Sequence, residues 1–249
     1  SSLDDWPPAV FGDRGFVGVL LGAAHGAAKT AKLLHSFGAT TVHIEVSRNV
    51  FATTPATLQR AEFESYKHLL YWDFLTGKVN ESHPLYTWLL QNGASDALIT
   101  TIADLHAPID IMGINYYPQW SDIEIIEESN GQCKEQIVAG GKENLLKIIK
   151  EQYARYNIPV MITETSWKGL PEEKIAWLQR STEALRDSQE SNIEIVGYTW
   201  FPALEMVDWK YRSHPGELYQ YRLNLGFWDL NRVENPAAEM YRSIIRMWN

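Results

Sequence analysis

Residues 159–178, PVMITETSWKGLPEEKIAWL, contain the pattern that decides the fold. The run 159–164 is mostly apolar, as is typical of a strand buried on both faces, and it ends in Glu164. Pro171 and the acids Glu172 and Glu173 then mark a helix start, because proline suits the first helical position and carboxylates suit the positive end of the helix dipole. The stretch therefore predicts a buried strand followed by a helix.

The same strand-then-helix pattern occurs three more times in the chain. Strands are predicted at 41–46, 109–117 and 194–200, and helices at 17–36, from 55 to about 74, at 143–156 and at 236–248. The segments 47–55 and 200–229 are predicted loops, and 121–140 is a long loop or a small hairpin. Strands that alternate with helices predict an α/β fold with a parallel sheet and right-handed crossovers.

Four strand-helix units are half of a (β/α)8 barrel of the TIM-barrel type, so the fold is predicted to be about the last four such units. No linker rich in Pro, Gly or Ser divides the chain, and residues 1–249 are expected to form a single domain. The long loops follow strands. In a parallel barrel this is the end that carries the ligand site.

Composition excludes several classes of function. The 249 residues include 22 Lys and Arg against 31 Asp and Glu, and a net charge of −9 without a basic run argues against nucleic acid and anionic membranes as partners. The single cysteine, Cys133, excludes an internal disulfide and any CxxC motif. No stretch has the roughly 18 apolar residues of a membrane helix or the pattern of a secretory signal, so a cytoplasmic location is expected.

Polar or aromatic side chains stand at the predicted strand ends. They are Glu45, then Asn115 with Tyr117, then Glu164, then Trp200 followed by Glu205 and Asp208. In a parallel barrel such ends converge on one cavity. Aromatic rings stack on the C–H faces of sugars, and a pair of carboxylates can cleave a glycosidic bond. The combination therefore favours a carbohydrate substrate.

Three ordered motifs carry a resemblance to a known family. They are GINYY at 113–117, ITE at 162–164, and GYTW at 197–200 continuing to LEMVDW at 204–209. In order and spacing they resemble the last three strand motifs of glycoside hydrolase family 1, the β-glucosidase and β-galactosidase family. The resemblance runs from about Trp6 to the C-terminus. It implies the C-terminal half of a glycosidase barrel that hydrolyses terminal β-linked sugars with retention and requires no metal or organic cofactor.

The resemblance also implies roles for particular residues. Glu164 looks like the catalytic nucleophile, and Tyr117 like the tyrosine that hydrogen-bonds it. Trp200 looks like the aromatic platform under the sugar. The remaining implied residues line the pocket or grip the hydroxyls of the non-reducing sugar, namely Asn115, Glu205, Asp208 and Trp209.

The sequence departs from the family pattern at four points. Asp208 is shorter than the usual glutamate, Thr165 replaces an asparagine, and one extra residue separates the two tryptophans at 200 and 209, so the identity of the sugar is open. The acid/base glutamate of the family lies in an Asn-Glu-Pro motif that is absent from this sequence, and Asp5 is only a weak substitute. We therefore expect the missing barrel half, or a second copy of the chain, as a partner.

Plainer interpretations exist for each of these residues. Glu164 and Glu45 fit solvated strand ends, and for Glu45 this is the favoured interpretation. Tyr117 and Trp200 also fit core packing. Glu205 and Asp208 also fit surface acids on a loop.

A different class of function also fits the motifs. In this alternative the chain is a non-catalytic carbohydrate-binding or interaction protein that keeps the aromatic cleft without the proton donor. Phosphate-binding and serine-hydrolase functions are excluded, because the sequence lacks a P-loop, a dinucleotide fingerprint and a GxSxG elbow. His25, His35 and His43 lack paired metal-ligand spacing.

Overall fold

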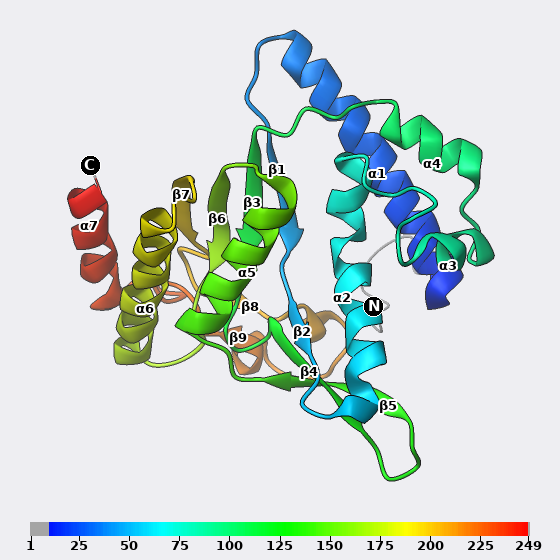
Figure 1. Cartoon of the computed structure of the whole chain (residues 1–249). Helices are drawn as coiled ribbons and strands as arrows, with labels where there is room; N and C mark the ends of the chain where they lie inside the picture. The colour runs from blue at the N-terminus through cyan, green and yellow to red at the C-terminus, as the bar shows by residue number, and fades with distance from the viewer. Residues whose placement is uncertain (1–9, 249) are drawn as a thin grey trace. The chain divides into compact units, whose positions relative to one another are not determined.

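The computed structural model describes residues 10–248 (Figure 1). Backbone contacts divide the chain into two compact units. The first contains residues up to Glu45, Val50–Met112 and Glu124–Gln136, and the second contains Val46–Asn49, Gly113–Ile123 and the residues from Ile137 onward. The boundary crosses strands rather than a linker, and the single-domain organisation stays our prediction.

The first unit contains four helices besides parts of several strands. The helices are α1 (Gly12–Ser36), α2 (Pro55–Leu75), α3 (Tyr86–Gln91) and α4 (Asp96–Ala103). Their apolar faces share one buried cluster, to which α1 contributes Leu20 and Ala24 and α2 contributes Leu70 and Phe74. Helix α1 stops before Gly38, whose positive φ of 76° suits glycine, as the sequence predicts.

A parallel sheet carries the predicted site. Its strands are β1 (Val42–Val46), β3 (Ile111–Asn115), β6 (Val160–Thr165) and β7 (Ile195–Trp200), in the order β1-β3-β6-β7. Strands β6 and β7 are parallel, with Val160 opposite Ile195. Neighbouring strands follow one another along the chain, as in a (β/α)8 barrel. The predicted α/β barrel type is therefore confirmed.

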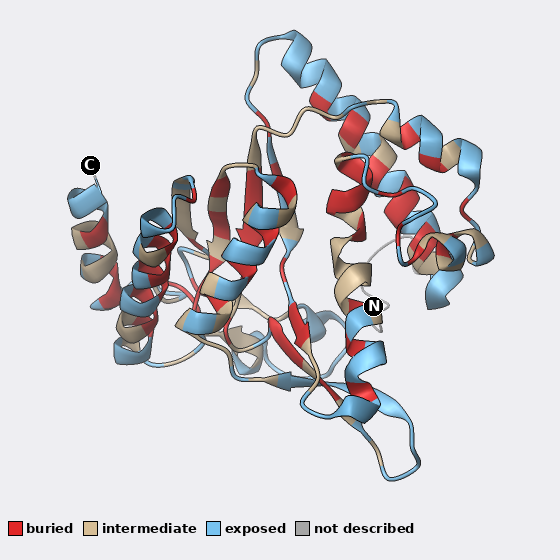
Figure 2. Cartoon of the chain, in the orientation of Figure 1, coloured by how far each residue is buried: buried red, intermediate tan, exposed pale blue. Residues whose placement is uncertain are grey.

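Three helices cover one face of this sheet in the second unit. They are α5 (Lys142–Tyr156), α6 (Pro171–Glu190) and α7 (Ala237–Trp248), which lie side by side in Figure 1. Each has a buried stripe toward the sheet and an exposed outer face (Figure 2). Helix α6 begins at Pro171, as its start signals predict, and the Glu173 side chain accepts a hydrogen bond from Leu170 N.

The predicted loops contain additional strands. Segment 47–55 includes β2 (Asn49–Phe51), and segment 121–140 includes β4 (Asp122–Glu127) and β5 (Cys133–Val138), which form a second sheet in the order β2-β4-β5. The hairpin alternative for 121–140 is therefore the right one, whereas the loop prediction for 47–55 missed β2. A strand as short as β2 shows no alternation that a sequence pattern can reveal.

The long segment after β7 is also partly ordered. It contains β8 (Met206–Val207), the 3-10 helices η1 (Trp209–Arg212) and η2 (Leu218–Tyr221), and β9 (Arg222–Leu223), which pairs antiparallel with β8.

Across residues 10–248, no helix combines the length and the apolar character that crossing a bilayer requires.

Candidate active site

Glu164 and Tyr117 meet at the C-terminal ends of neighbouring strands. The Tyr117 hydroxyl donates to Glu164 Oε2 over 2.6 Å, and the backbone N–H of Tyr116 donates to the Glu164 carbonyl over 2.9 Å. Both side chains are half-buried. Burial raises the pKa of Tyr117 above its ordinary value, and the adjacent carboxylate raises it further, so the hydroxyl stays protonated as a donor.

Strand alternation separates the two tyrosines. Tyr117 reaches Glu164, whereas the buried Tyr116 points the other way, where its hydroxyl donates to Asp122 Oδ2 over 2.6 Å and its ring packs against Trp177. Asp122 is fully buried and also accepts from Asn49 Nδ2 over 2.9 Å. This buried network holds the β3 end in place beside Glu164.

Asn115 lies one strand away from Glu164. It is buried at the end of β3, and its Oδ1 accepts from Thr163 Oγ1 over 2.7 Å. Thr163 immediately precedes Glu164 on β6. The structure thus brings Asn115, Tyr117 and Glu164 to the same edge of the sheet.

Trp200 ends β7 in a closely packed environment. The residue is 4% exposed, its ring stacks on Phe227 with centroids 4.9 Å apart, and its Nε1 donates to Leu225 O over 3.0 Å. These contacts match the packing interpretation. A platform role for the remaining face of the ring stays a prediction.

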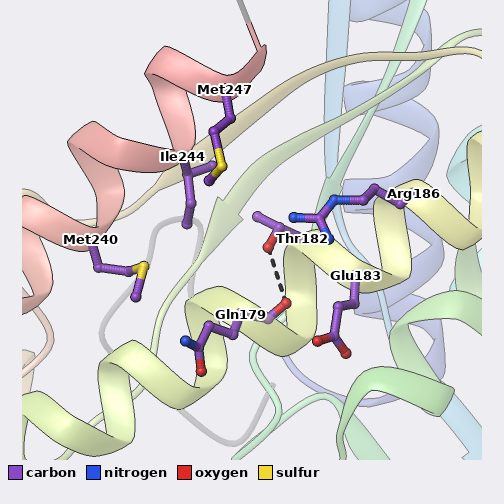
Figure 3. A pocket seen from close by; sticks show the side chains of 7 residues that line it. All are labelled: Gln179, Thr182, Glu183, Arg186, Met240, Ile244 and Met247. Atoms are coloured by element: carbon purple, nitrogen blue, oxygen red, sulfur yellow. Dashed lines mark hydrogen bonds between the residues drawn. The ribbon is translucent and has the colours of Figure 1, made fainter.

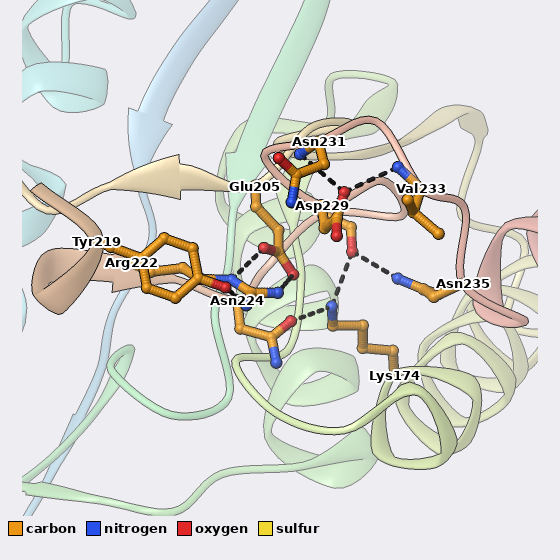
Figure 4. Close-up of polar contacts among 10 residues, drawn as sticks. Lys174, Glu205, Tyr219, Arg222, Asn224, Asp229, Asn231, Val233 and Asn235 are labelled. Atoms are coloured by element: carbon orange, nitrogen blue, oxygen red, sulfur yellow. Dashed lines mark hydrogen bonds and ion pairs between the residues drawn. The ribbon is translucent and has the colours of Figure 1, made fainter.

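Glu205 forms a bidentate ion pair with Arg222 (Figure 4). Arg222 Nη2 lies 2.8 Å from Glu205 Oε1, and Nε donates to the other carboxylate oxygen. The Glu205 side chain is 3% exposed, whereas that of Arg222 is 29% exposed. The hydrogen bond from Glu205 raises the pKa of Arg222. Both carboxylate oxygens are occupied within the protein, so any contact with a sugar has to share them.

Lys174 is a buried cation that the sequence analysis missed. It lies in the first turns of α6, is 1% exposed, and donates over 2.7 Å to both Asn224 Oδ1 and Gly226 O (Figure 4). Burial lowers the pKa of Lys174 to about 8. These bonds fix the chain on both sides of Leu225, whose carbonyl holds Trp200. A lysine within an amphipathic helix usually lies on the exposed face, and no pattern in the sequence marks this one as buried.

Asp208 and Trp209 belong to the loop after β8. Asp208 Oδ1 accepts from Lys210 N over 3.0 Å and caps the short helix η1. Trp209 is 40% exposed, and the Arg212 guanidinium lies 4.6 Å from the centre of its ring. The loop is thus stabilised by local contacts. Asp5, the weak candidate for the acid/base group, lies outside the described residues.

Comparison with solved structures places this arrangement in a known fold. No protein-family model and no curated protein matches the sequence. The family 1 β-glucosidase from Thermotoga maritima matches 96% of this chain with a TM-score of 0.77 and 12% identity, and its complex with deoxynojirimycin gives 0.78 with 12% identity over the same share. The GH1 β-glucosidase from Exiguobacterium antarcticum B7 matches 94% with a TM-score of 0.68 and 16% identity. The chain has the fold of a partial family 1 β-glucosidase barrel.

The match covers only part of these enzymes. The chain spans 58% of the length of either Thermotoga structure and 56% of the Exiguobacterium one. Within this family 1-like fold, Asn115 and Tyr117 at the end of β3 lie beside Glu164 at the end of β6. Glu205, Asp208 and Trp209 lie on the segment after β7, where each contacts another residue of that segment.

A pocket on the outer surface of the second unit is separate from this site. It has a volume of about 340 Å³ and lies between α6 and α7 (Figure 3). Its lining includes Gln179, Glu183 and Arg186 of α6 and Met240, Ile244 and Met247 of α7, and no predicted site residue. Among residues 10–248 there is also no group of three or more side chains suited to hold a metal ion.

Proposed function

We propose that this chain is part of a retaining β-glycosidase that acts on terminal β-linked sugars, with Glu164 as the nucleophile. The observation that carries the proposal is the 2.6 Å hydrogen bond from Tyr117 to Glu164 at the strand ends of a family 1-like fold. A half-buried carboxylate with one oxygen held in place keeps the other oxygen available for attack.

In the proposed reaction, the free oxygen of Glu164 bonds to the anomeric carbon while the bond to the departing oxygen breaks. A carboxylic acid gives that oxygen its proton and becomes a carboxylate. In the second step this carboxylate takes a proton from water, the water oxygen bonds to the anomeric carbon, and Glu164 is released. Two inversions give net retention, and retention calls for carboxyl groups about 5–5.5 Å apart.

Tyr117 would stabilise the Glu164 charge in the free protein. Its hydrogen bond weakens as the carboxylate loses charge on forming the glycosyl ester, and strengthens again when the ester breaks. The raised pKa of Tyr117 keeps the donor proton in place over the whole working pH range. Loss of this hydroxyl would slow the first step because the attacking carboxylate loses its fixed orientation, and would slow the second because the departing carboxylate loses a hydrogen-bond donor.

We propose that the acid/base group comes from a partner, either the missing barrel half or a second copy of the chain. The residues predicted from the motifs supply a nucleophile and sugar contacts but no proton donor. Val42, Ile44 and Val46 occupy every second position of β1, the first strand in the sheet order, so they share one face, and these residues are 41%, 50% and 48% exposed. A closed barrel covers such a strand. The intact mass of the native assembly tests this: a lone, fully active monomer contradicts it.

Hydrolysis of dinitrophenyl β-D-glucoside and β-D-galactoside tests the reaction, because these leaving groups need little protonation. We expect measurable release that Glu164→Gln lowers by at least about 10³-fold. The control is Glu194→Gln. Glu194 is an exposed residue just before the N-terminal end of β7, whereas Glu164 lies near the C-terminal end of the parallel strand β6. Proton NMR should show the β-anomer as the first product.

Two results would count against the proposal. An unchanged rate in Glu164→Gln would remove the nucleophile. Sugar binding without turnover, in the native assembly, would instead favour the non-catalytic carbohydrate-binding alternative.

A further inference from the structure

Residues 224–228, here called the strap, connect two of the predicted sugar contacts. Trp200 Nε1 donates to Leu225 O over 3.0 Å. Glu205 N donates to Trp228 O over 2.8 Å. The position of the strap therefore determines where the Trp200 ring and the Glu205 backbone lie.

The strap packs directly against the backbone that carries Glu205. A Cβ atom added to Gly226 would overlap the backbone nitrogen of Glu205, so only glycine allows this approach. Phe227 N also donates to Ala203 O over 2.8 Å. Because the two segments are in such close contact, a displacement of the strap would move residues 203–205 with it.

Lys174 on α6 holds the strap from another direction (Figure 4). Its Nζ donates over 2.7 Å to Asn224 Oδ1 and over 2.7 Å to Gly226 O. Leu225 lies between these two acceptors in the chain. The ammonium group therefore fixes the strap at the point where the strap accepts the hydrogen bond from Trp200.

A buried lysine is a costly way to fill this space. Lys174 is 1% exposed, and burial lowers its pKa to about 8. The charged groups that act on it are Glu205, which favours the ammonium form, and Arg222, which opposes it. A methionine has a similar length and would pack here without the cost of a buried charge. It could not donate the two hydrogen bonds, so these bonds are what the lysine adds.

We propose that Lys174 is a positioning residue for the sugar site, which holds Trp200 and Glu205, through the strap, in the arrangement that binds the non-reducing sugar. This inference rests on the proposed function, since it assumes that these two residues contact a sugar. Lys174 is buried and would act through the strap rather than by touching the sugar. A site whose groups are fixed in advance loses less conformational entropy when its ligand binds.

The test measures sugar binding by the full chain in its native assembly. Calorimetry gives the dissociation constants of methyl 1-thio-β-D-glucoside and methyl 1-thio-β-D-galactoside, which resist hydrolysis. We expect the unaltered chain to bind at least one of them, and Lys174→Met to weaken that binding about tenfold, because the strap loses two hydrogen bonds. Lys174→Arg keeps a cation with N–H donors and should restore the dissociation constant to within about threefold of the original value.

Urea unfolding of the same variants at pH 7.5 separates positioning from stability. Lys174→Met removes a buried charge together with its hydrogen bonds, so the midpoint of unfolding should stay close to that of the unaltered chain while binding weakens. Ser188→Ala is the matched control on α6. Ser188 is also fully buried, but its hydroxyl donates over 2.8 Å to Ala184 O of the same helix. This variant should leave sugar binding unchanged.

Asn224→Ala is a second variant that keeps Lys174 and removes one of its acceptors. It should weaken sugar binding about threefold, and it carries the test if Lys174→Met does not fold. The positioning role would be overturned by binding that neither variant weakens, by a loss that Lys174→Arg does not restore, or by a loss that appears only with a lowered unfolding midpoint. Absence of binding of both thioglycosides to the unaltered chain would overturn it as well.

Failure of this inference is distinguishable from failure of the proposed function. A covalent sugar on Glu164 together with unchanged binding in Lys174→Met would refute only the positioning role. Binding that depends on Lys174, without any covalent sugar, would keep the positioning role in a sugar-binding protein and refute the hydrolase.

Discussion

Arg222→Met is the substitution that most directly tests how the loop after β7 is held. Glu205 is 3% exposed and accepts two hydrogen bonds from Arg222. Removing one partner of a buried ion pair leaves a buried, uncompensated charge, which costs about 3–5 kcal/mol. Arg222 itself is 29% exposed, so water replaces part of the lost guanidinium. We therefore expect the free energy of unfolding to fall by about 2–3 kcal/mol.

Urea unfolding followed by far-ultraviolet circular dichroism measures this change. The matched control is Arg246→Met on α7, because Arg246 pairs with Glu239 over 3.2 Å while both side chains are largely exposed. The control should change the free energy of unfolding by less than about 0.5 kcal/mol.

A double variant separates the pair from its surroundings. Glu205→Leu combined with Arg222→Met removes the buried charge together with its partner, so it should be less destabilised than Arg222→Met alone. If Arg222→Met were as stable as the unaltered chain, or if the double variant were the less stable one, the ion pair would not be what holds this loop.

Three further substitutions test other parts of the account. Asp122→Ala should lower the free energy of unfolding by about 3 kcal/mol in urea, because it orphans the buried amide and hydroxyl donors that the carboxylate now accepts from; a loss below about 1 kcal/mol would show the network to be dispensable. Burial lowers the pKa of Lys174 to about 8 in the folded chain, against an ordinary value of 10.5. Between these two pH values Lys174 is therefore mostly neutral in the folded chain and mostly protonated in the unfolded chain. The stability of the unaltered chain relative to Lys174→Met should therefore rise from pH 7.5 to pH 9.5, and a flat difference would contradict the burial of that cation. Tyr117→Phe should slow sugar transfer to Glu164 at least about tenfold while changing the free energy of unfolding by less than about 1.5 kcal/mol, and an unchanged rate would remove the assigned role.

Local signals explain why most elements could be predicted from the sequence. Proline and acids mark the start of α6, Gly38 marks the end of α1, and apolar runs mark β3 and β6, since each signal acts within a few residues. Parallel topology predicts that the strand ends near Tyr117 and Glu164 share one edge of the sheet, and the family resemblance implies the hydrogen bond between them.

Contacts between distant residues explain what the sequence could not predict. Glu205 resembles a sugar-binding acid by motif, but its partner Arg222 lies 17 residues further along the chain. The burial of Lys174 depends on acceptors from Asn224 and Gly226, some 50 residues away.

The most direct test of the central claim is covalent trapping of Glu164. The native assembly is incubated with dinitrophenyl 2-deoxy-2-fluoro-β-D-glucoside, whose electron-withdrawing fluorine slows release of the glycosyl-enzyme, and the labelled peptide is sequenced by mass spectrometry. We predict one sugar per chain, attached to the carboxylate of Glu164, and none in Glu164→Gln. A label on another carboxylate, or catalytic turnover that the reagent does not inhibit, would contradict the account.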